Sequence, residues 1–311
     1  MKRRLVPYVV ATLLGVLYGV FVRFAATAWP DSFLLVSVGF VFGVPFGMGY
    51  VTIAWLPEAN GWYATFQPWF TWLLAVVGSL VCGWEGLICI AMVTPLALVC
   101  ASAGGWLALW ARRHSVRSVG FVLALPLVVI PIESGLELAP TIRVVPTTID
   151  IAASPETVWA QIREVPEIPP EERGTTWFNR IGFPRPVEAK LFGEGVGSVR
   201  HASFERGVLF VERVTAWEEG RRLAFSIEAD TKHIPATSLD EHVTIGGRYF
   251  DVLDGEYRLE VLPAGGTRLH LTSHHRLTTT LEPYAGLWSD AIMRSIQRRI
   301  LEIIRYRCEH A

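Results

Sequence analysis

Charged residues are scarce in the first part of this 311-residue chain. Residues 1–139 contain only seven Lys or Arg and five Asp or Glu, whereas residues 140–311 contain 21 and 24. In a typical water-soluble domain, about a quarter of the residues are charged. The scarcity therefore excludes an ordinary soluble domain at 1–139. We predict two domains, 1–139 and 140–311.

Cysteine and an excess of basic charge are also missing. The chain has four cysteines, three of them in apolar runs, and their spacing indicates neither a disulfide framework nor a zinc site. The formal net charge is −1, so the basic excess typical of a nucleic-acid-binding module is absent. We therefore expect no metal, no cofactor and no nucleic-acid partner.

The first domain is instead rich in long apolar runs. A helix that spans a bilayer needs roughly 20 mainly apolar residues. Five segments predict an α-helical membrane bundle of about five transmembrane helices: 5–28, 33–56, 68–84, 87–110 and 119–138. The fifth segment is the weakest, because it contains Pro126 and Pro131 and its apolar core is followed by Glu133.

Basic residues in the loops indicate the orientation of such a bundle, because Lys and Arg are enriched on the cytoplasmic side. Four crossings would separate MKRR at 1–4 from ARRHSVRS at 111–118, which places both in the cytoplasm. We predict an integral multi-pass protein of a bacterial cytoplasmic membrane with a cytoplasmic N-terminus. A complete fifth crossing makes the C-terminal domain extracytoplasmic, which we favour; a segment that dips in and returns would leave it cytoplasmic.

Residues 140–311 show the periodicities of an α+β domain. The stretch TTIDIA at 147–152 alternates as a strand does, and Ser154 followed by Pro155 is typical of a helix start. Several segments of period two, bounded by glycine turns, follow between 186 and 276. The last segment, about 282–308, has apolar residues at steps of three and four, which predicts a long amphipathic helix.

This order of elements predicts a curved antiparallel sheet wrapped on the C-terminal helix. The apolar stripe of the helix has to be buried, and one face of the sheet is the only large apolar surface available. One helix cannot fill a strongly bent sheet along its whole length. We therefore expect a cavity between the sheet and the helix.

Three stretches carry a family resemblance: IDIAASPETVWAQI from 149, GVGSVRHASFERGVLFVERVTAWEEGRRLAFSI from 195, and GEYRLEVLPAGGTRLHLTS from 255. With the terminal helix, they resemble the START-like, helix-grip (SRPBCC) superfamily over about 146–308, in its polyketide cyclase/dehydrase and lipid-transport branch. The resemblance implies a helix-grip domain with a hydrophobic-ligand cavity under the C-terminal helix. It does not fix an activity. The first domain resembles no family that we recognise.

Strand parity selects the polar side chains that would face this cavity. A three-residue loop at ERG, 205–207, pairs His201 with Val211 and Arg200 with Glu212. The more apolar face, which continues to Phe225, is expected to point inward. The candidate ligand-binding residues are His201, Arg213, Tyr257, His275, Phe225, Trp177 and Trp288.

Arg200 and Glu212 fall on the other face under this parity, where they would form a solvated cross-strand ion pair. If the face is assigned wrongly, they become a buried pair that can orient a polar ligand group. They are therefore secondary candidates.

The predicted function is a membrane-anchored protein that binds a lipid or other hydrophobic small molecule, with the lipid bilayer as its second partner. Two alternatives stay open. One is a polyketide cyclase-like enzyme with a histidine as general acid or base, and the other is a non-catalytic interaction or regulatory module. A metal site at His233, Glu241, His242, His274 and His275 is disfavoured, because adjacent histidines on a strand point to opposite faces.

Overall fold

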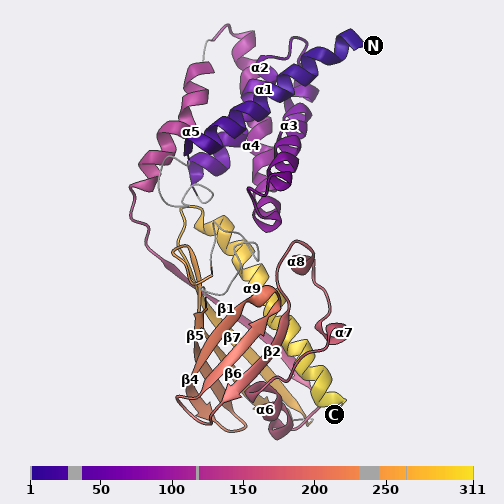
Figure 1. Cartoon of the computed structure of the whole chain (residues 1–311), viewed down its shortest axis with the longest axis vertical. Helices are drawn as coiled ribbons and strands as arrows, with labels where there is room; N and C mark the ends of the chain where they lie inside the picture. The colour runs from indigo at the N-terminus through magenta and orange to yellow at the C-terminus, as the bar shows by residue number, and fades with distance from the viewer. Residues whose placement is uncertain (1, 27–36, 117–118, 231–244, 264, 311) are drawn as a thin grey trace. The chain divides into compact units, whose positions relative to one another are not determined.

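The computed structural model describes residues 2–26, 37–116, 119–230, 245–263 and 265–310 (Figure 1). The chain divides into two compact units, Met1–Leu138 and Ala139–Ala311. The first is called the helical unit below and the second the sheet unit.

The described part of the helical unit consists of α-helices and one π-helical turn. They are α1 (Lys2–Ala26), η2 (Gly39–Gly43), α2 (Val44–Ala54), α3 (Gly61–Val81), α4 (Leu87–Arg113) and α5 (Val119–Ser134). Helix α3 begins seven residues before the predicted segment, because the Asn60 side chain accepts hydrogen bonds from the N–H groups of Trp62 and Tyr63, at 3.0 and 3.2 Å.

Three of these helices are long and apolar enough to cross a membrane, judged by length and composition. They are Leu5–Ala25, Gly61–Val81 and Leu87–Arg113. The segments Gly39–Ala54 and Gly120–Ser134 are apolar but shorter. The prediction of apolar helices is thus confirmed, whereas the count of five spanning helices is not.

Helices α2 and α4 pack with their backbones in contact. A Cβ atom added to Gly49 would lie 1.9 Å from the carbonyl oxygen of Ala101, and one added to Gly104 would lie 1.9 Å from that of Phe46. Only glycine fits at either position. Such small-residue contacts are typical of helix packing where no water drives association.

Charged side chains inside the helical unit are matched by partners. Nε of Arg23, at the end of α1, donates to Glu85 at 2.8 Å. Glu133, which is 7% exposed, accepts from the backbone N–H groups of Val38 and Gly39 at 2.9 and 2.8 Å. These contacts offset the cost of placing a charge among apolar helices.

The sheet unit begins with β1 (Thr141–Ile151), and three short helices follow: α6 (Pro155–Arg163), α7 (Pro170–Arg173) and α8 (Trp177–Arg180). Its other elements are β2 (Pro186–Phe192), β3 (Val199–Phe204), η3 (Glu205–Gly207), β4 (Leu209–Glu218), β5 (Arg222–Ala229), β6 (Phe250–Val261), β7 (Thr267–Leu277) and α9 (Glu282–Glu309). The strands form one antiparallel seven-stranded sheet in the order β1-β7-β6-β5-β4-β3-β2.

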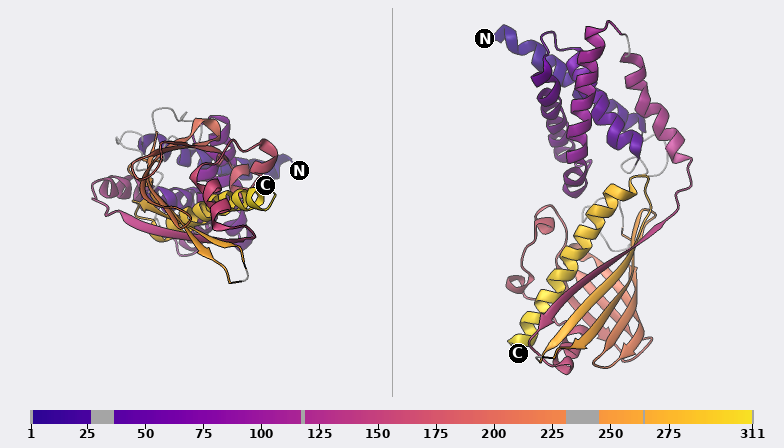
Figure 2. Two further views of the ribbon diagram at one scale, coloured as in Figure 1. Left: turned by 90° about the horizontal axis from the view of Figure 1, so that it is seen from below. Right: turned by 180° about the vertical axis from the view of Figure 1, so that it is seen from behind.

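The sheet curls around α9, which runs along β1 (Figure 2). Two β-bulges contribute to the bend, one in β4 between Val214 and Ala216 and one in β6 between Val252 and Asp254. The helix buries Ile292, Ile303 and Ile304, as the sequence predicts. Leu287 also belongs to the apolar pattern of this segment, but it is 69% exposed.

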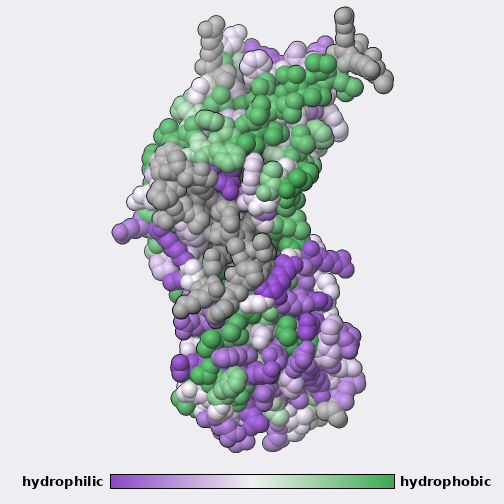
Figure 3. Space-filling view, viewed as in Figure 1, coloured by the Kyte–Doolittle hydropathy of each residue, from purple (hydrophilic) through white to green (hydrophobic). Residues whose placement is uncertain are grey.

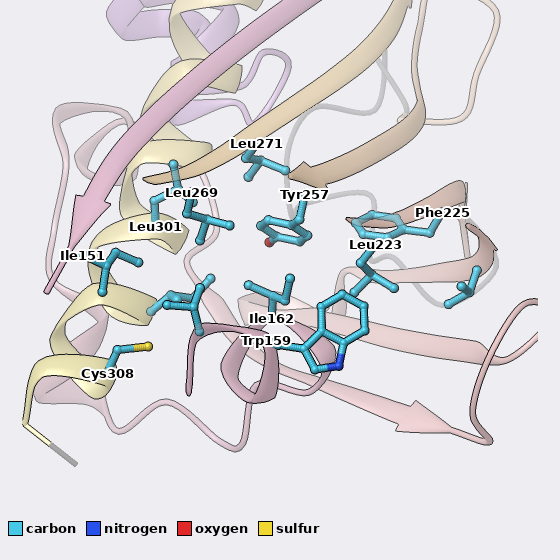
Figure 4. Close-up of a cluster of buried hydrophobic side chains, with 13 residues drawn as sticks. Ile151, Trp159, Ile162, Leu223, Phe225, Tyr257, Leu269, Leu271, Leu301 and Cys308 are labelled. Atoms are coloured by element: carbon cyan, nitrogen blue, oxygen red, sulfur yellow. The ribbon is translucent and has the colours of Figure 1, made fainter. Parts of the chain in front are cut away.

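A solid core fills one end of the space between sheet and helix (Figure 4). Trp159 and Ile162 of α6 pack there against Leu223 of β5, Leu269 of β7 and Leu301 of α9. Fully burying one such aliphatic side chain contributes roughly 1.5–3 kcal/mol.

Candidate ligand-binding site

The expected cavity is present in the sheet unit, with a volume of about 130 Å³. Apolar side chains of the sheet, of α9 and of the segment after α8 dominate its lining: Val165, Ile168, Phe183, Pro184, Pro186, Ala189, Ala202, Phe204, Val208, Phe210, Phe225, Ile227, Ile245, Phe250, Val252, Leu271, Met293, Ile296, Ile300, Ile303 and Ile304. An apolar cavity of about 150 Å³ takes up benzene, whereas drug-sized ligands occupy about 300–1,000 Å³. The space therefore matches a ring-sized or short-chain apolar group.

Three polar side chains from three strands meet in this apolar lining. Arg200 of β3 and Glu212 of β4 are paired in register, lie 4% and 6% exposed, and form an ion pair through Nη1 and Oε2. The Arg200 guanidinium also interacts with the hydroxyl of Tyr257 on β6. Its Nε–H has no hydrogen-bond partner among the described residues.

The ring of Phe225 on β5 supports the guanidinium. The Arg200 Cζ atom lies 5.5 Å from the centre of that ring, within cation–π range. Gly255, paired with Phe225 in the sheet, makes room for the ring, since a Cβ atom there would lie 2.7 Å from it. Figure 4 shows Tyr257 beside Phe225, and their ring centroids are 6.1 Å apart.

Burial affects the protonation of Tyr257 and Glu212. Burial raises the pKa of Tyr257 to about 12, although the charge of Arg200 acts in the opposite direction. The hydroxyl of Tyr257 therefore stays neutral. Burial also raises the pKa of Glu212, which the charge of Arg200 opposes. Because an arginine stays protonated and an unpaired buried charge is very costly, we take the pair as ionised and electrically neutral overall.

A second polar part of the lining is centred on Gln297, whose side chain forms its hydrogen bonds with other protein groups. Gln297 of α9 is 2% exposed; its Nε2 donates to the Val145 carbonyl at 3.0 Å and to Ser273 Oγ at 2.9 Å. Its Oε1 accepts from Thr147 at 2.5 Å. Sequence reasoning missed Gln297, although a glutamine four residues from both Met293 and Leu301 on a buried helix stripe signals a satisfied polar contact.

The structure reverses the expected parity of β3 and β4. The predicted register is confirmed, with His201 opposite Val211 and Arg200 opposite Glu212. The bulge at Thr215, however, shifts the alternation before β5 is reached, so Glu212 shares a face with Ile227. Arg200 and Glu212 therefore line the cavity, whereas His201 and Arg213 do not.

Those two side chains lie on the outer face instead. His201 packs against Phe192, with ring centroids 4.9 Å apart. Arg213 is exposed. The expectation that both face the ligand is corrected by this geometry.

His275 faces inward as predicted, but it contacts α9 and does not line the cavity. It is 0% exposed, and its Nε2 lies 3.0 Å from Ser289 Oγ and 3.7 Å from Asp290. Asp290 in turn is held by two hydrogen bonds from Arg143 of β1, each 2.8 Å long. Burial lowers the pKa of His275, with Asp290 acting in the opposite direction. The cluster ties the start of α9 to β1 and β7.

Tyr257 and Phe225 line the cavity, whereas Trp177 and Trp288 do not. The two tryptophans stack on each other, with ring centroids 6.0 Å apart, and Trp177 is 51% exposed. The predicted contact of these tryptophans with ligand stays a prediction.

Within the described residues, no group of three or more His, Cys, Asp and Glu is arranged to hold a metal ion. His233, Glu241 and His242, considered above as ligands, lie outside the described residues. His274 and His275 point to opposite faces, and Nδ1 of His274 contacts Asp254 at 2.5 Å.

No family model and no curated protein sequence matches the chain. Among solved structures, it is similar to the Zhui aromatase/cyclase from Streptomyces sp. R1128, with 18% identity and a TM-score of 0.34 over 54% of this chain and 94% of that one. Truncated norcoclaurine synthase from Thalictrum flavum matches with 11% identity and a TM-score of 0.35, over 57% of this chain and 99% of that one. The Aha1 dimer from Colwellia psychrerythraea matches with 14% identity and a TM-score of 0.32, over 54% and 97%. Likeness at this level says nothing about activity.

Proposed function

We propose that this chain is an integral membrane protein whose sheet unit binds a lipid or other hydrophobic small molecule. Helices α1, α3 and α4 would serve as the membrane anchor, because they have the required length and composition. The observation that carries the binding proposal is the apolar cavity of about 130 Å³ between the sheet and α9.

The chemistry of the lining supports an apolar ligand. Most of the wall is aliphatic or aromatic, so a bound apolar group gains about 25 cal/mol for each Å² removed from water. A few polar groups in such a wall typically fix the orientation of a ligand. The volume suits one ring or a short chain, so a larger lipid would insert only part of itself.

Attachment to a membrane adds to this proposal. A binding site tethered beside a bilayer meets membrane-dissolved molecules at a high effective concentration, and a modest intrinsic affinity then suffices.

The alternatives receive less support from the site. The cyclase-like enzyme depends on an inward histidine as acid or base, and the described cavity lining contains none. A purely structural or regulatory module would be expected to have a solidly packed interface between sheet and helix, whereas this one encloses space.

Native mass spectrometry of the full chain, purified in detergent, tests the binding proposal. We expect the protein to carry or take up apolar molecules. The variant Ala202→Leu, whose larger side chain fills the cavity, should no longer carry the added mass of a bound molecule. The variant Ala160→Leu, on the exposed side of α6, should still carry it. A wild-type chain that stays empty after incubation with membrane lipids and small aromatic compounds would contradict the proposal.

We further propose that the N-terminus is cytoplasmic and the sheet unit extracytoplasmic. The native Cys308 cannot report the side, because it is buried and burial raises the pKa of its thiol to about 11. A Glu194→Cys variant in a Cys82→Ser background offers an exposed thiol on the β2–β3 turn. Labelling by a membrane-impermeant maleimide in intact cells is expected; labelling only after lysis would place the sheet unit in the cytoplasm.

A further inference from the structure

The face of α9 that points away from the sheet is basic. Before Glu309, the exposed positions of this helix are Pro283, Leu287, Arg294, Arg298, Arg305 and Tyr306, and none of them is acidic. Leu287 and the three arginines follow one another at steps of seven, four and seven residues, so they lie along one side of the helix. These four residues are called the outer stripe below.

The positive charge of the outer stripe is only weakly compensated within the protein. Arg298 and Arg305 form no ion pair and no side-chain hydrogen bond with any other residue that the structure describes. Arg294 is 58% exposed, and its Nη2 lies 3.8 Å from Asp290, whose carboxylate is already bound by Arg143 at 2.8 Å. The outer stripe therefore carries positive charge that an anionic partner can pair with.

Exposed apolar side chains lie at the start of the outer stripe. Leu287 is 69% exposed. At the next position, Trp288 stacks on Trp177 of α8, with ring centroids 6.0 Å apart, and Trp177 is itself 51% exposed. Tyr284 packs edge-on against Trp288, with ring centroids 6.4 Å apart. Exposed leucine and tryptophan beside arginine are typical of helices that lie in the interface of a bilayer.

This combination of side chains favours a lipid surface over other anionic partners. A nucleic acid would pair with the arginines, but its phosphate backbone offers no apolar layer for Leu287 and Trp177. At a bilayer, arginines meet lipid phosphates, while leucine and tryptophan enter the boundary between headgroups and acyl chains. The apolar helices of the helical unit, as the anchor proposed above, would also keep such a surface at a high effective concentration.

We propose that the outer stripe and the Trp177–Trp288 pair dock on the surface of a bilayer that contains anionic lipids. This inference rests on the membrane anchor proposed above and adds a peripheral contact to it. Ile296 and Ile300, on the other side of α9, line the cavity. The width of one helix, about 10–12 Å, separates the docking surface from the ligand site, so an apolar molecule has a short way between them.

Fluorescence quenching of the full chain in nanodiscs tests the docking. Leu287→Cys, in a Cys82→Ser/Cys89→Ser/Cys100→Ser background, is labelled with a maleimide dye, and Ser226→Cys, exposed on the outer face of β5, is the control site. The discs contain phosphatidylcholine and anionic phosphatidylglycerol, and a small fraction of the headgroups carries a nitroxide quencher. We expect the dye at Leu287 to be quenched several-fold more strongly than the dye at Ser226.

Charge variants show whether the outer stripe causes this quenching. Arg294→Gln/Arg298→Gln should lower the ratio of docked to undocked sheet unit about 25-fold, because each arginine near an anionic surface contributes about a five-fold change. Arg213→Gln/Arg221→Gln removes the same charge from exposed positions elsewhere and should leave the quenching unchanged. Discs of phosphatidylcholine alone should weaken the quenching at Leu287 as the first variant does.

The outcomes distinguish a failure of the docking from a failure of the anchor. If the chain does not incorporate into nanodiscs, the proposed anchor fails and the docking fails with it. If the chain incorporates but the two dyes are quenched equally, the anchor stands and the docking surface is overturned. The same conclusion follows if the two charge variants have equal effects, or if neutral lipid quenches the dye at Leu287 as strongly as anionic lipid does.

Discussion

The two units differ in what they present outward and in how they bury polar groups. Large apolar side chains such as Leu17 and Phe21 are more than 60% exposed on the helical unit, and Figure 3 shows its visible face as mainly hydrophobic. The visible face of the sheet unit is more hydrophilic, with smaller apolar patches (Figure 3). One surface suits lipid and the other suits water.

The interiors also differ in some of the polar groups that they bury. Thr52 and Thr71 share a hydrogen bond of 3.1 Å inside the helical unit, where small hydroxyl groups join the helices. The sheet unit buries a full ion pair, Arg200 with Glu212, beside a cavity. A buried ion pair contributes little to stability compared with apolar residues of the same size. Stability alone therefore does not account for the pair.

The largest expected effect comes from breaking that pair. Arg200→Met leaves the Glu212 carboxylate buried without a partner and should lower the free energy of unfolding of the sheet unit by about 3–5 kcal/mol. Arg200→Met/Glu212→Met should recover most of that loss. Hydrogen exchange of β3 and β4 in the full chain measures both variants, and equal destabilisation by the two would argue against an ionised pair.

A smaller effect is expected from the helix contact in the other unit. Gly49→Ala places a Cβ atom 1.9 Å from the Ala101 carbonyl, so α2 and α4 must separate, at a cost of about 1–3 kcal/mol. Gly78→Ala is the matched control, because an added Cβ atom there meets nothing within 4 Å. Thermal unfolding in detergent should show a lower Tm for the first variant alone; equal Tm values would mean that the two helices pack more loosely.

A pH dependence should follow from His275. Burial lowers its pKa in the folded state, so the unfolded chain binds the proton more readily. Its contribution to stability is complete above the unfolded pKa of about 6.5 and is lost as the pH falls below that value. The nearby charges are Asp290 and Arg143. His275→Asn should flatten the decline in Tm between pH 7 and 5, whereas His310→Asn, at an exposed position, should leave the slope unchanged.

The smallest effect is expected at the surface pair of Asp150 and Arg268. These side chains are 52% and 39% exposed, and their ion pair is 2.7 Å long. Water screens such a pair, so Arg268→Ala should leave Tm within experimental error. A clear loss would show that outer-face charges of the sheet matter more than their exposure indicates.

Local sequence patterns were sufficient to predict the strand pairing at the site and the direction of one of its side chains. The ERG loop predicts the pairing of Arg200 with Glu212, and the alternation in β7 predicts that His275 points inward; both hold in the structure. The face that Arg200 and Glu212 occupy could not be read in the same way. One extra residue at Thr215 reverses the alternation, and no signal in the sequence marks that bulge.

By itself, the sequence determined the separation of an apolar helical part from an α+β part and the order of strands and helices, because composition and periodicity act over neighbouring residues. It also determined that one long helix must be buried against one sheet. The tertiary structure alone decided which polar side chains enter the cavity and how large that cavity is. The reason is that bulges in β4 and β6 change the alternation and the bend of the strands, and the resulting curvature depends on strands that are distant in sequence and pack together.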